Sequence, residues 1–387
     1  MVSIARLPFV LLLVLLVSVW VSTTAKPDFS TTSTLTETVD STTEHIGFVK
    51  QWTLTAAGNN NNDDDDDDDS SDDSSDDGDD RIDSIKLQLP GRVFVSYSSR
   101  LPSGILGYVN VSGDSQSLVE AVKVGSDDDD EELRVKYDGS SSTSTGYLLT
   151  EIFLSTSNIV DDVEIESTAE VVIEDGVLVA SNTNKEVQIK ASDSSIVYVS
   201  SSALSLQDLK LELSDSATLQ LTTDSITIRE DGQFQAHDTS SIKVLTSSLK
   251  VDDLDLDAEN SGTICISATE VTASSYDGQD ASKISLPNAS SKYTSTGSDS
   301  CDEASTPSRE PGCVSSGSCA LTTTSTSTPS TTTASSTSTT TVASDSTATA
   351  SSSGVRTSEQ ASGASASANM YAVGVSIAIG LVLMISL

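Results

Sequence analysis

The sequence has few basic and few aromatic residues. Lys and Arg number 20 against 58 acidic residues, which gives a formal net charge of -38, and aromatic residues make up 4% of the chain. A chain this acidic is repelled by nucleic acid and by anionic membrane surfaces, so its charge argues against both as direct ligands. With so few aromatic residues, only part of the 387 residues can form a packed core.

Histidine is almost absent, and with it a common means of acid–base catalysis. The two histidines are His45 and His237, and His237 precedes Asp238 in a strand-like segment where adjacent side chains point to opposite faces. The chain contains no G-x-S-x-G elbow, phosphate-binding glycine loop or H-E-x-x-H helix. We expect no enzyme activity and no cofactor, and we expect His237 to be an exposed residue at a repeat corner.

The four cysteines include no C-x-x-C pair and have no histidine among them, which argues against a zinc site. Their even number indicates two disulfides in an oxidising compartment. Three pairings are open, and we favour Cys265 with Cys301 and Cys313 with Cys319.

Long apolar runs occur only at the two ends of the chain. Arg6 precedes an apolar run over residues 7–21, and small residues at 23–25 suit the site of a signal peptidase. The pattern predicts a signal peptide over 1–25 and a mature chain that begins at Lys26. The alternative is a transmembrane anchor, which the shortness of the run disfavours.

At the other end, an uncharged tail from Met370 has no Lys or Arg after it, unlike the cytoplasmic flank of most spanning helices. Small residues precede the tail, and this order predicts a glycosylphosphatidylinositol (GPI) anchor signal over 363–387, with a single span as the alternative. The attachment candidates are Ser362, Gly363 and Ala364. The expected location is extracellular, at the plasma membrane through the lipid anchor or in the cell wall.

Ser and Thr dominate two further segments. Residues 26–45 are expected to be disordered, and residues 321–362 have the composition of an O-glycosylated stalk or of an unmodified linker. A Cys-containing tail over 297–320 precedes the stalk. The sequons at Asn110 and Asn288 predict N-glycosylation of a secreted chain.

A repeated pattern occupies the middle of the chain. Five segments begin at Ser167, Asp193, Asp215, Asp238 and Asn260, at intervals of 26, 22, 23 and 22 residues. Each has a small polar corner and then two apolar residues separated by one position, which places both apolar side chains on one face of a strand. Two strands per repeat, joined by polar turns, predict an all-β fold, a β-solenoid with coils of about 22 residues.

The solenoid is expected over residues 46–296 because a single coil has too little apolar surface to fold alone, whereas stacked coils share one core. A β-sandwich is the main alternative, and the near-constant interval favours the solenoid, with right-handed parallel winding. The outward positions are expected to form an ordered row that includes Tyr198, Gln220, Lys243 and Cys265.

An acidic insertion at residues 59–80 lies between two strand-like segments, IGFVKQWTLTA and IDSIKLQL. Like charges this close favour an extended, solvated loop. The nearest match to an EF-hand loop starts at Asp73 but has Ser84 where the bidentate Glu belongs. We therefore expect no specific metal site, only weak and diffuse cation association, and the same interpretation applies to the acidic run Asp127–Glu132.

The repeats resemble those of the auto-transporter adhesin head domains, also called head GIN domains, where a small corner such as S-G-S-G precedes an alternating apolar strand. Here SDSATLQL, DTSSIKVL and NSGTICI stand in that place, and the resemblance extends over residues 82–286. It implies a β-helical surface module and brings no catalytic residues. Two features depart from the family: Gly262 is the only corner glycine, and bacterial autotransporters lack the eukaryote-like anchor and stalk.

Three classes of function follow. An adhesive surface protein would present outward ladders to extracellular glycans or surface proteins, whereas a structural wall or coat glycoprotein would hydrate the surface without recognition. A solenoid polysaccharide-active enzyme is the remote alternative. We favour the first class, with the membrane reached only through the lipid anchor.

Overall fold

The computed structural model describes residues 29–56, 81–126, 132–139, 145–287, 293, 301–315 and 319. They all belong to the first of two units, residues 1–323, and the second unit, residues 324–387, falls wholly outside them. The signal peptide, the acidic insertion, Asn288, the stalk and the GPI signal with Ser362, Gly363 and Ala364 therefore lie outside the described residues. No helix in the described ranges has the length and apolar character needed to cross a membrane.

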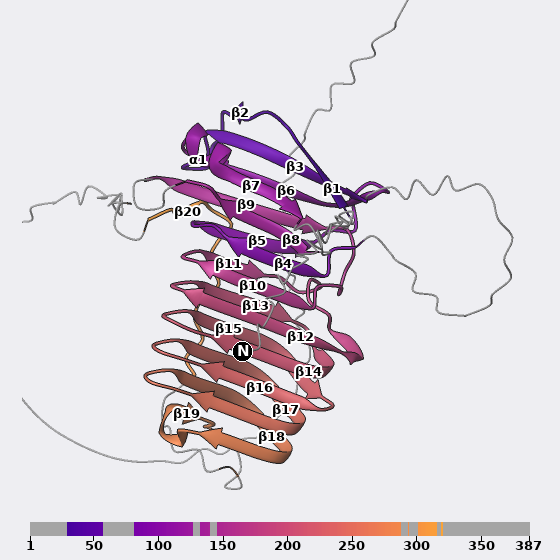
Figure 1. Cartoon of the computed structure of the whole chain (residues 1–387), viewed down its shortest axis with the longest axis vertical. Coiled ribbons are helices and arrows are strands. Elements are labelled where there is room, and N and C mark those ends of the chain that lie inside the picture. Colours follow the sequence, from indigo (N-terminus) through magenta and orange to yellow (C-terminus); the bar gives the residue numbers. More distant parts are fainter. Residues whose placement is uncertain are drawn as a thin grey trace, which may run out of the picture. The chain divides into compact units, whose positions relative to one another are not determined.

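The described chain forms the predicted β-solenoid, with parallel strands stacked coil upon coil (Figure 1). The alternation of apolar and polar residues gives each strand one buried side. The coils are built from β4 (Ser84–Gln88), β5 (Arg92–Tyr97), β8 (Glu132–Tyr137), β9 (Tyr147–Leu154), β10 (Asp162–Ser167), β11 (Glu170–Ile173), β12 (Ser181–Asp193), β13 (Ile196–Ser201), β14 (Leu204–Leu213), β15 (Thr218–Ile228), β16 (Asp231–Ala236), β17 (Ser241–Ala258) and β18 (Thr263–Gln279), followed by the turn η1 (Ala281–Lys283) and β19 (Ile284–Ser285).

The coils from β12 onward have three faces, whereas the sequence predicted two strands per repeat. The single strand β17 turns through all three, since it pairs with β18 over residues 241–246, 248–251 and 253–257. Face 1 is the first of these segments with the strands stacked on it, including β13, β11, β5 and β9. Face 2 is the middle segment, and face 3 is the third with β16, β12, β10, β4 and β8. The middle segment is so short that the sequence pattern does not distinguish it as a separate strand.

Left-handed residues mark the corner between faces 3 and 1. Asp193, Asp215, Asp238 and Asn260 open four of the repeats, with φ angles between 52° and 60°. Asp and Asn adopt this conformation more readily than most residues with a side chain. They also bond along the stack, since the Asp193 N–H donates to Asp215 Oδ2 at 3.2 Å and Asn260 Nδ2 donates to Asp238 Oδ1 at 3.1 Å. The corners therefore need little glycine, which accounts for one departure from the adhesin-head pattern.

Inward side chains form columns through the stack. Val171, Val197, Leu219, Ile242 and Ile264 occupy equivalent positions in successive coils, and none is more than 1% exposed. Burying a side chain of this size stabilises the fold by about 1.5–3 kcal/mol. Because each member packs against its neighbours in the adjoining coils, one coil alone achieves only part of this burial.

An antiparallel cap closes the N-terminal end of the stack. β3 pairs with β6, and β6 pairs with β9, so the cap continues the sheet of face 1. Such a cap protects the first coil from pairing with other chains. The cap consists of β1 (Phe29–Ser33), β2 (Glu37–Thr38), β3 (Phe48–Ala56), β6 (Ile105–Gly113), the short helix α1 (Gln116–Ala121) and β7 (Val122–Ser126).

The prediction of disorder over residues 26–45 is wrong for the described part, residues 29–45. β1 and β2 both pair with β3, and Phe29 is only 1% exposed. Local Ser/Thr-rich composition hid this structure, because the strands are held by pairing with β3 rather than by an apolar pattern of their own.

Candidate functional site

One row of outward side chains runs the length of face 1. The last four members were predicted from the sequence as an outward row, and the in-register pairing confirms it. Following the stack from the cap, the row consists of Glu151, Phe94, Val172, Tyr198, Gln220, Lys243 and Cys265.

The chain itself covers this row. After the last coil, residues 301–315 run back across face 1 towards the cap, and we call this segment the strap. A disulfide from Cys301 to Cys265 fixes its beginning, with a Cα–Cα distance of 5.5 Å that is usual for the bond. Lys243 Nζ then donates to the Asp302 carbonyl at 3.2 Å.

Arg309, which belongs to the strap, attaches the part of the strap nearest the cap to the coils. Its Nη1 donates to Glu151 at 3.0 Å, and its Nη2 donates to Glu174 at 2.6 Å and to the Ser96 hydroxyl at 2.6 Å. The guanidinium carbon lies 4.9 Å from the centre of the Phe94 ring, a cation–π contact. Burial alone would lower the pKa of Arg309, but the hydrogen bonds and charges of the two glutamates outweigh it and raise that pKa.

Arg92 provides the next attachment. Its Nε donates to Glu170 at 2.7 Å, while its Nη1 donates to the carbonyls of Ser308 and Glu310 at 3.0 and 3.1 Å. Nη2 also donates to the Glu170 carboxylate. The arginine thus connects the stacked coils to the strap backbone.

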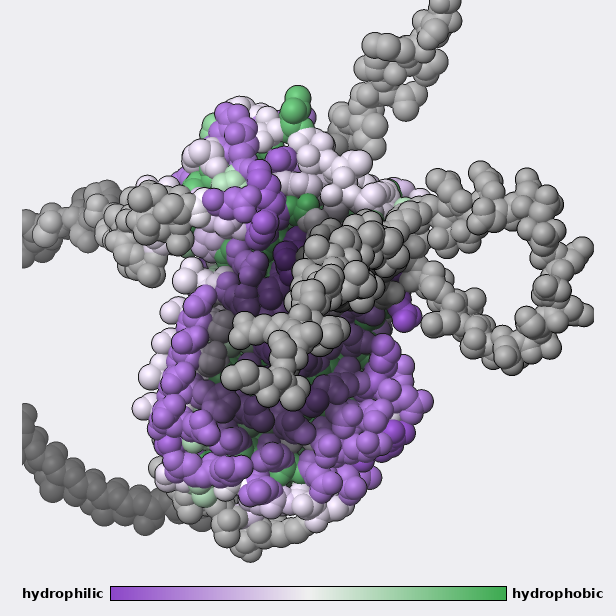
Figure 2. All heavy atoms as spheres, viewed as in Figure 1, coloured by the Kyte–Doolittle hydropathy of each residue, from purple (hydrophilic) through white to green (hydrophobic). Residues whose placement is uncertain are grey.

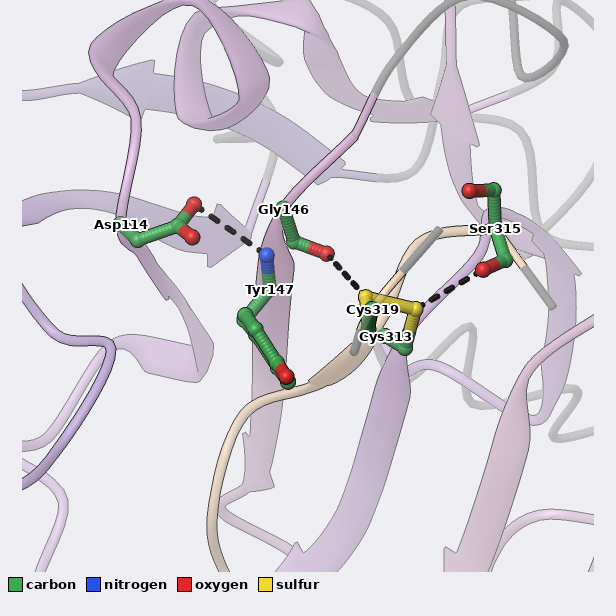
Figure 3. Close-up of a disulfide and its surroundings, with 6 residues drawn as sticks. All are labelled: Asp114, Gly146, Tyr147, Cys313, Ser315 and Cys319. Atoms are coloured by element: carbon green, nitrogen blue, oxygen red, sulfur yellow. Dashed lines mark hydrogen bonds between the residues drawn. A yellow bond between two sulfur atoms is a disulfide. The ribbon is translucent and has the colours of Figure 1, made fainter. Parts of the chain in front are cut away.

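The strap ends as a strand beside the cap. β20 (Gly312–Cys313) pairs antiparallel with the start of β9, and the Cys313–Cys319 disulfide closes a small loop there (Figure 3). The Tyr147 N–H donates to Asp114 Oδ1 at 3.1 Å, which ties the same strand to the cap. The Cys319 sulfur lies 3.4 Å from the Gly146 carbonyl oxygen, a contact without a donated proton because a disulfide sulfur carries no hydrogen.

The strap changes the interpretation of face 1. Gln220, Phe94 and Val172 are only 7%, 3% and 4% exposed. The predicted use of this row as a ligand-binding ladder is therefore wrong, because the strap already occupies it. Both disulfides have the pairing that the sequence favoured, but the path between them could not be inferred from spacing alone.

Face 3 remains free of the strap and carries charged ladders. In the early coils Lys86 pairs with Glu164 at 2.7 Å, and further on Lys210 pairs with Glu186 at 2.7 Å. Hydrophilic residues dominate the visible surface over these stacked coils (Figure 2).

The last coils of face 3 are acidic. Asp231 pairs in register with Asp253, and Asp255 with Asp277. Burial and the neighbouring carboxylates raise the pKa of both Asp231 and Asp255. Within the described ranges, no group of three His, Cys, Asp or Glu side chains is placed to hold a metal ion.

A polar cavity of about 530 Å³ lies where the cap, face 1 and the strap meet, and we call it the cap pocket. His45 has a left-handed backbone with φ 64°, and its ring stacks on Tyr147 with centroids 3.6 Å apart and planes inclined by 13°. The lining of the cap pocket consists of Thr42, Thr43, Glu44, His45, Arg92, Tyr147, Glu310 and Pro311. No sequence pattern predicts this pocket, because the three segments that form it are distant along the chain.

Neither Asn110 nor His237 lines this pocket. Asn110 is in the middle of β6, where its side-chain oxygen accepts a hydrogen bond from Gln51 Nε2 at 2.8 Å. His237 lies at a repeat corner beside Asp238, as expected, but it is partly buried rather than exposed, with its Nδ1 3.3 Å from Glu259.

No model of a known protein family matches the chain, and no curated protein matches it. Among solved structures, it is similar to a candidate adhesin of Parabacteroides distasonis, with 16% identity, 50% of this chain and 77% of that chain covered, and a TM-score of 0.30. A candidate adhesin of Parabacteroides merdae has 13% identity, coverages of 69% and 96%, and a TM-score of 0.29. A candidate lipid-binding protein of Parabacteroides distasonis has 11% identity, coverages of 53% and 92%, and a TM-score of 0.28. At these TM-scores the similarities carry no argument about a ligand, and the solenoid rests on the strand pairing itself.

Proposed function

We propose that the chain is a secreted, GPI-anchored glycoprotein of the cell surface or wall, whose β-solenoid serves in adhesion or in binding extracellular glycans or surface proteins. The disulfide-fixed strap is the observation that carries this proposal. The Cys265–Cys301 disulfide fixes its beginning to the last coil, the Cys313–Cys319 disulfide closes a loop at its end, and disulfides persist in oxidising compartments such as the extracellular space.

The strap also decides which surfaces can meet a ligand. Face 1 is occupied by the chain itself, whereas the cap pocket and face 3 are open. Loops held on a rigid scaffold are the usual place for binding residues, and six of the eight residues that line the cap pocket belong to loops, while Arg92 and Tyr147 begin strands. We assign ligand binding to the cap end.

A hydrated coat without specific recognition is the second candidate. The acidic ladder that includes Asp231, Asp253 and Asp255 favours it, because closely stacked carboxylates hold water and repel other acidic surfaces.

Binding assays separate the two candidates. The full chain is expressed through the secretory pathway of a eukaryotic host, and its mature product is tested on wall polysaccharides and surface glycoproteins, with calcium and with chelator. Saturable binding to one class supports the adhesive function. No binding across the whole panel leaves the coat as the function, and loss of binding in chelator would assign a role to bound cations.

Processing is tested on the same material. Release of the chain from cells by a phosphatidylinositol-specific phospholipase would support the GPI anchor, and retention would contradict it. Replacing Ser362, Gly363 and Ala364 together should abolish anchoring. Asn110→Gln should increase electrophoretic mobility if that sequon carries a glycan.

A further inference from the structure

The cap pocket is formed in advance of any ligand. The connection between β2 and β3 is held where the Gly47 N–H donates to the Gly113 carbonyl at 2.9 Å. The strap side is held by Arg92, through the Glu310 carbonyl at 3.1 Å. The volume of about 530 Å³ falls within the range of pockets that bind small molecules, about 300–1,000 Å³.

The charges of the lining select against anions. Arg92 is the one lysine or arginine among the lining residues, and its Nε, Nη1 and Nη2 all donate within the protein, to Glu170 and to the strap carbonyls. Glu44 and Glu310 add two carboxylates to the same cavity. A phosphate, sulfate or uronate would meet repulsion there with no uncommitted arginine to offset it.

The same groups suit a ligand rich in hydroxyl donors. Carboxylates accept hydrogen bonds, and bonds to a charged acceptor are the stronger kind. The hydroxyls of Thr42 and Thr43 can donate as well as accept, so they adapt to the ligand.

The aromatic pair gives the pocket an apolar element. His45 lies flat on Tyr147, and Pro311 contributes a third ring to the lining. His45 has the left-handed backbone conformation that Asn, Asp and His adopt more readily than other residues with a side chain.

We propose that the cap pocket binds a neutral saccharide, with ring hydroxyls donating to Glu44 and Glu310 and an apolar sugar face against the aromatic pair. This inference rests on the proposed function and names its ligand class. The strap would then take part in recognition, because Glu310 and Pro311 belong to the strap and also line the cap pocket.

Two variants of the full chain test the assignment. His45→Gly removes the imidazole while keeping a residue that accepts positive φ, and Asn260→Gly makes the same change at a distant corner of the last coil. Glu310→Gln removes one carboxylate charge while the backbone carbonyl that binds Arg92 stays, and Glu303→Gln is the matched control on the strap. Circular dichroism and melting temperature check that each variant is folded.

The probes are fluorescent neutral oligosaccharides of glucose, mannose and N-acetylglucosamine, with polygalacturonate and heparin as acidic comparisons. We expect saturable binding of a neutral probe, weakened about tenfold by His45→Gly and by Glu310→Gln, and changed less than about twofold by either control.

Each other result overturns a definite part of the proposal. Preference for an acidic probe overturns the ligand class. Neutral binding that both pocket variants leave unchanged overturns the site, while adhesion as a function stands. Binding to surface proteins but to no saccharide overturns this inference alone, and no binding to either panel overturns the proposed function with it.

Discussion

Gln220 and Ala304 are joined by two hydrogen bonds although 84 residues separate them. Gln220 Nε2 donates to the Ala304 carbonyl at 3.0 Å, and the Ala304 N–H donates to Gln220 Oε1 at 2.7 Å. The side-chain amide thus does for the strap backbone what a neighbouring strand would do.

Replacing this amide should loosen the strap. Gln220→Leu leaves both backbone groups of Ala304 without their partner, and we expect a loss of about 1 kcal/mol of stability because solvent can replace part of the lost bonding. Hydrogen exchange of the Ala304 amide should become faster. The control is Gln235→Leu on the outward side of face 3, which should leave that exchange rate unchanged. Equal rates in both variants would contradict the role of Gln220.

The two disulfides should differ in their contribution to stability. In the chain-entropy account, a bond contributes more when it closes a longer loop, and the sequence separations are 36 and 6 residues. We expect removal of Cys265–Cys301 by serine substitution to cost about 4 kcal/mol, and removal of Cys313–Cys319 about 2 kcal/mol. Urea unfolding of the two double variants measures both. A larger loss from the shorter loop would refute this ranking.

Asp255 should make the fold more stable at mildly acidic pH. Burial raises its pKa above the ordinary value of 3.8, as do the carboxylates of Asp277, Asp257 and Asp231, and its Oδ1 has no hydrogen-bond partner in the described part of the chain. The folded state therefore binds this proton more tightly than the unfolded chain, so stability rises as the pH falls through the raised pKa and levels off below 3.8.

Asp255→Asn imitates the protonated side chain. At pH 7 the variant should exceed the original chain in stability by less than about 1 kcal/mol, and the difference should vanish as the pH approaches 3.8. Melting temperatures from pH 7 to pH 4 measure it. Asp252→Asn, at an exposed neighbouring position, is the control, and a difference that grows on acidification would rule out the interpretation.

Gly262 should resist substitution for a reason other than its backbone angle. A Cβ at this position would collide with the carbonyl group of Ala236 in the preceding coil. We expect Gly262→Ala to cost about 1–3 kcal/mol, since relieving the collision requires a shift of backbone. Gly125→Ala, where nothing lies within 4 Å of the added carbon, should cost much less. Similar melting temperatures for the two variants would show that the corner can relax.

The coils could be predicted because their turns and strands are determined by residues that are close together in the sequence. The small polar residues at the corners, such as Asp193 and Asn260, predict turns from their own residue type. Alternating apolar pairs, such as Val197 and Val199, predict strands with one buried face. Periodicity then supplies the stacking, since equivalent residues recur at intervals close to 22.

The strap and the cap pocket could not be predicted because they depend on contacts between residues that are far apart in the sequence. Arg309 meets Glu151 and Ser96 across 158 and 213 residues, and neither partner has a sequence pattern that identifies the other. His45 was visible as one of two histidines, but its position on Tyr147 depends on the folding of the cap. Only the cysteines of the tail hinted that this segment returns to the solenoid.

The return of the strap sets where mechanical tension enters the molecule. The described chain leaves at Cys319, beside Gly146 at the cap end, although the last coil lies at the opposite end of the stack. A pull on the chain beyond Cys319 therefore reaches the pairing of β20 with β9 first, and then the Arg92 and Arg309 attachments that precede it along the strap. Should these give way, the Cys265–Cys301 bond passes the pull directly to face 1 of the last coil. As long as the strap attachments hold, the force does not act on the end of the last coil, so it does not unfold the solenoid coil by coil from that end.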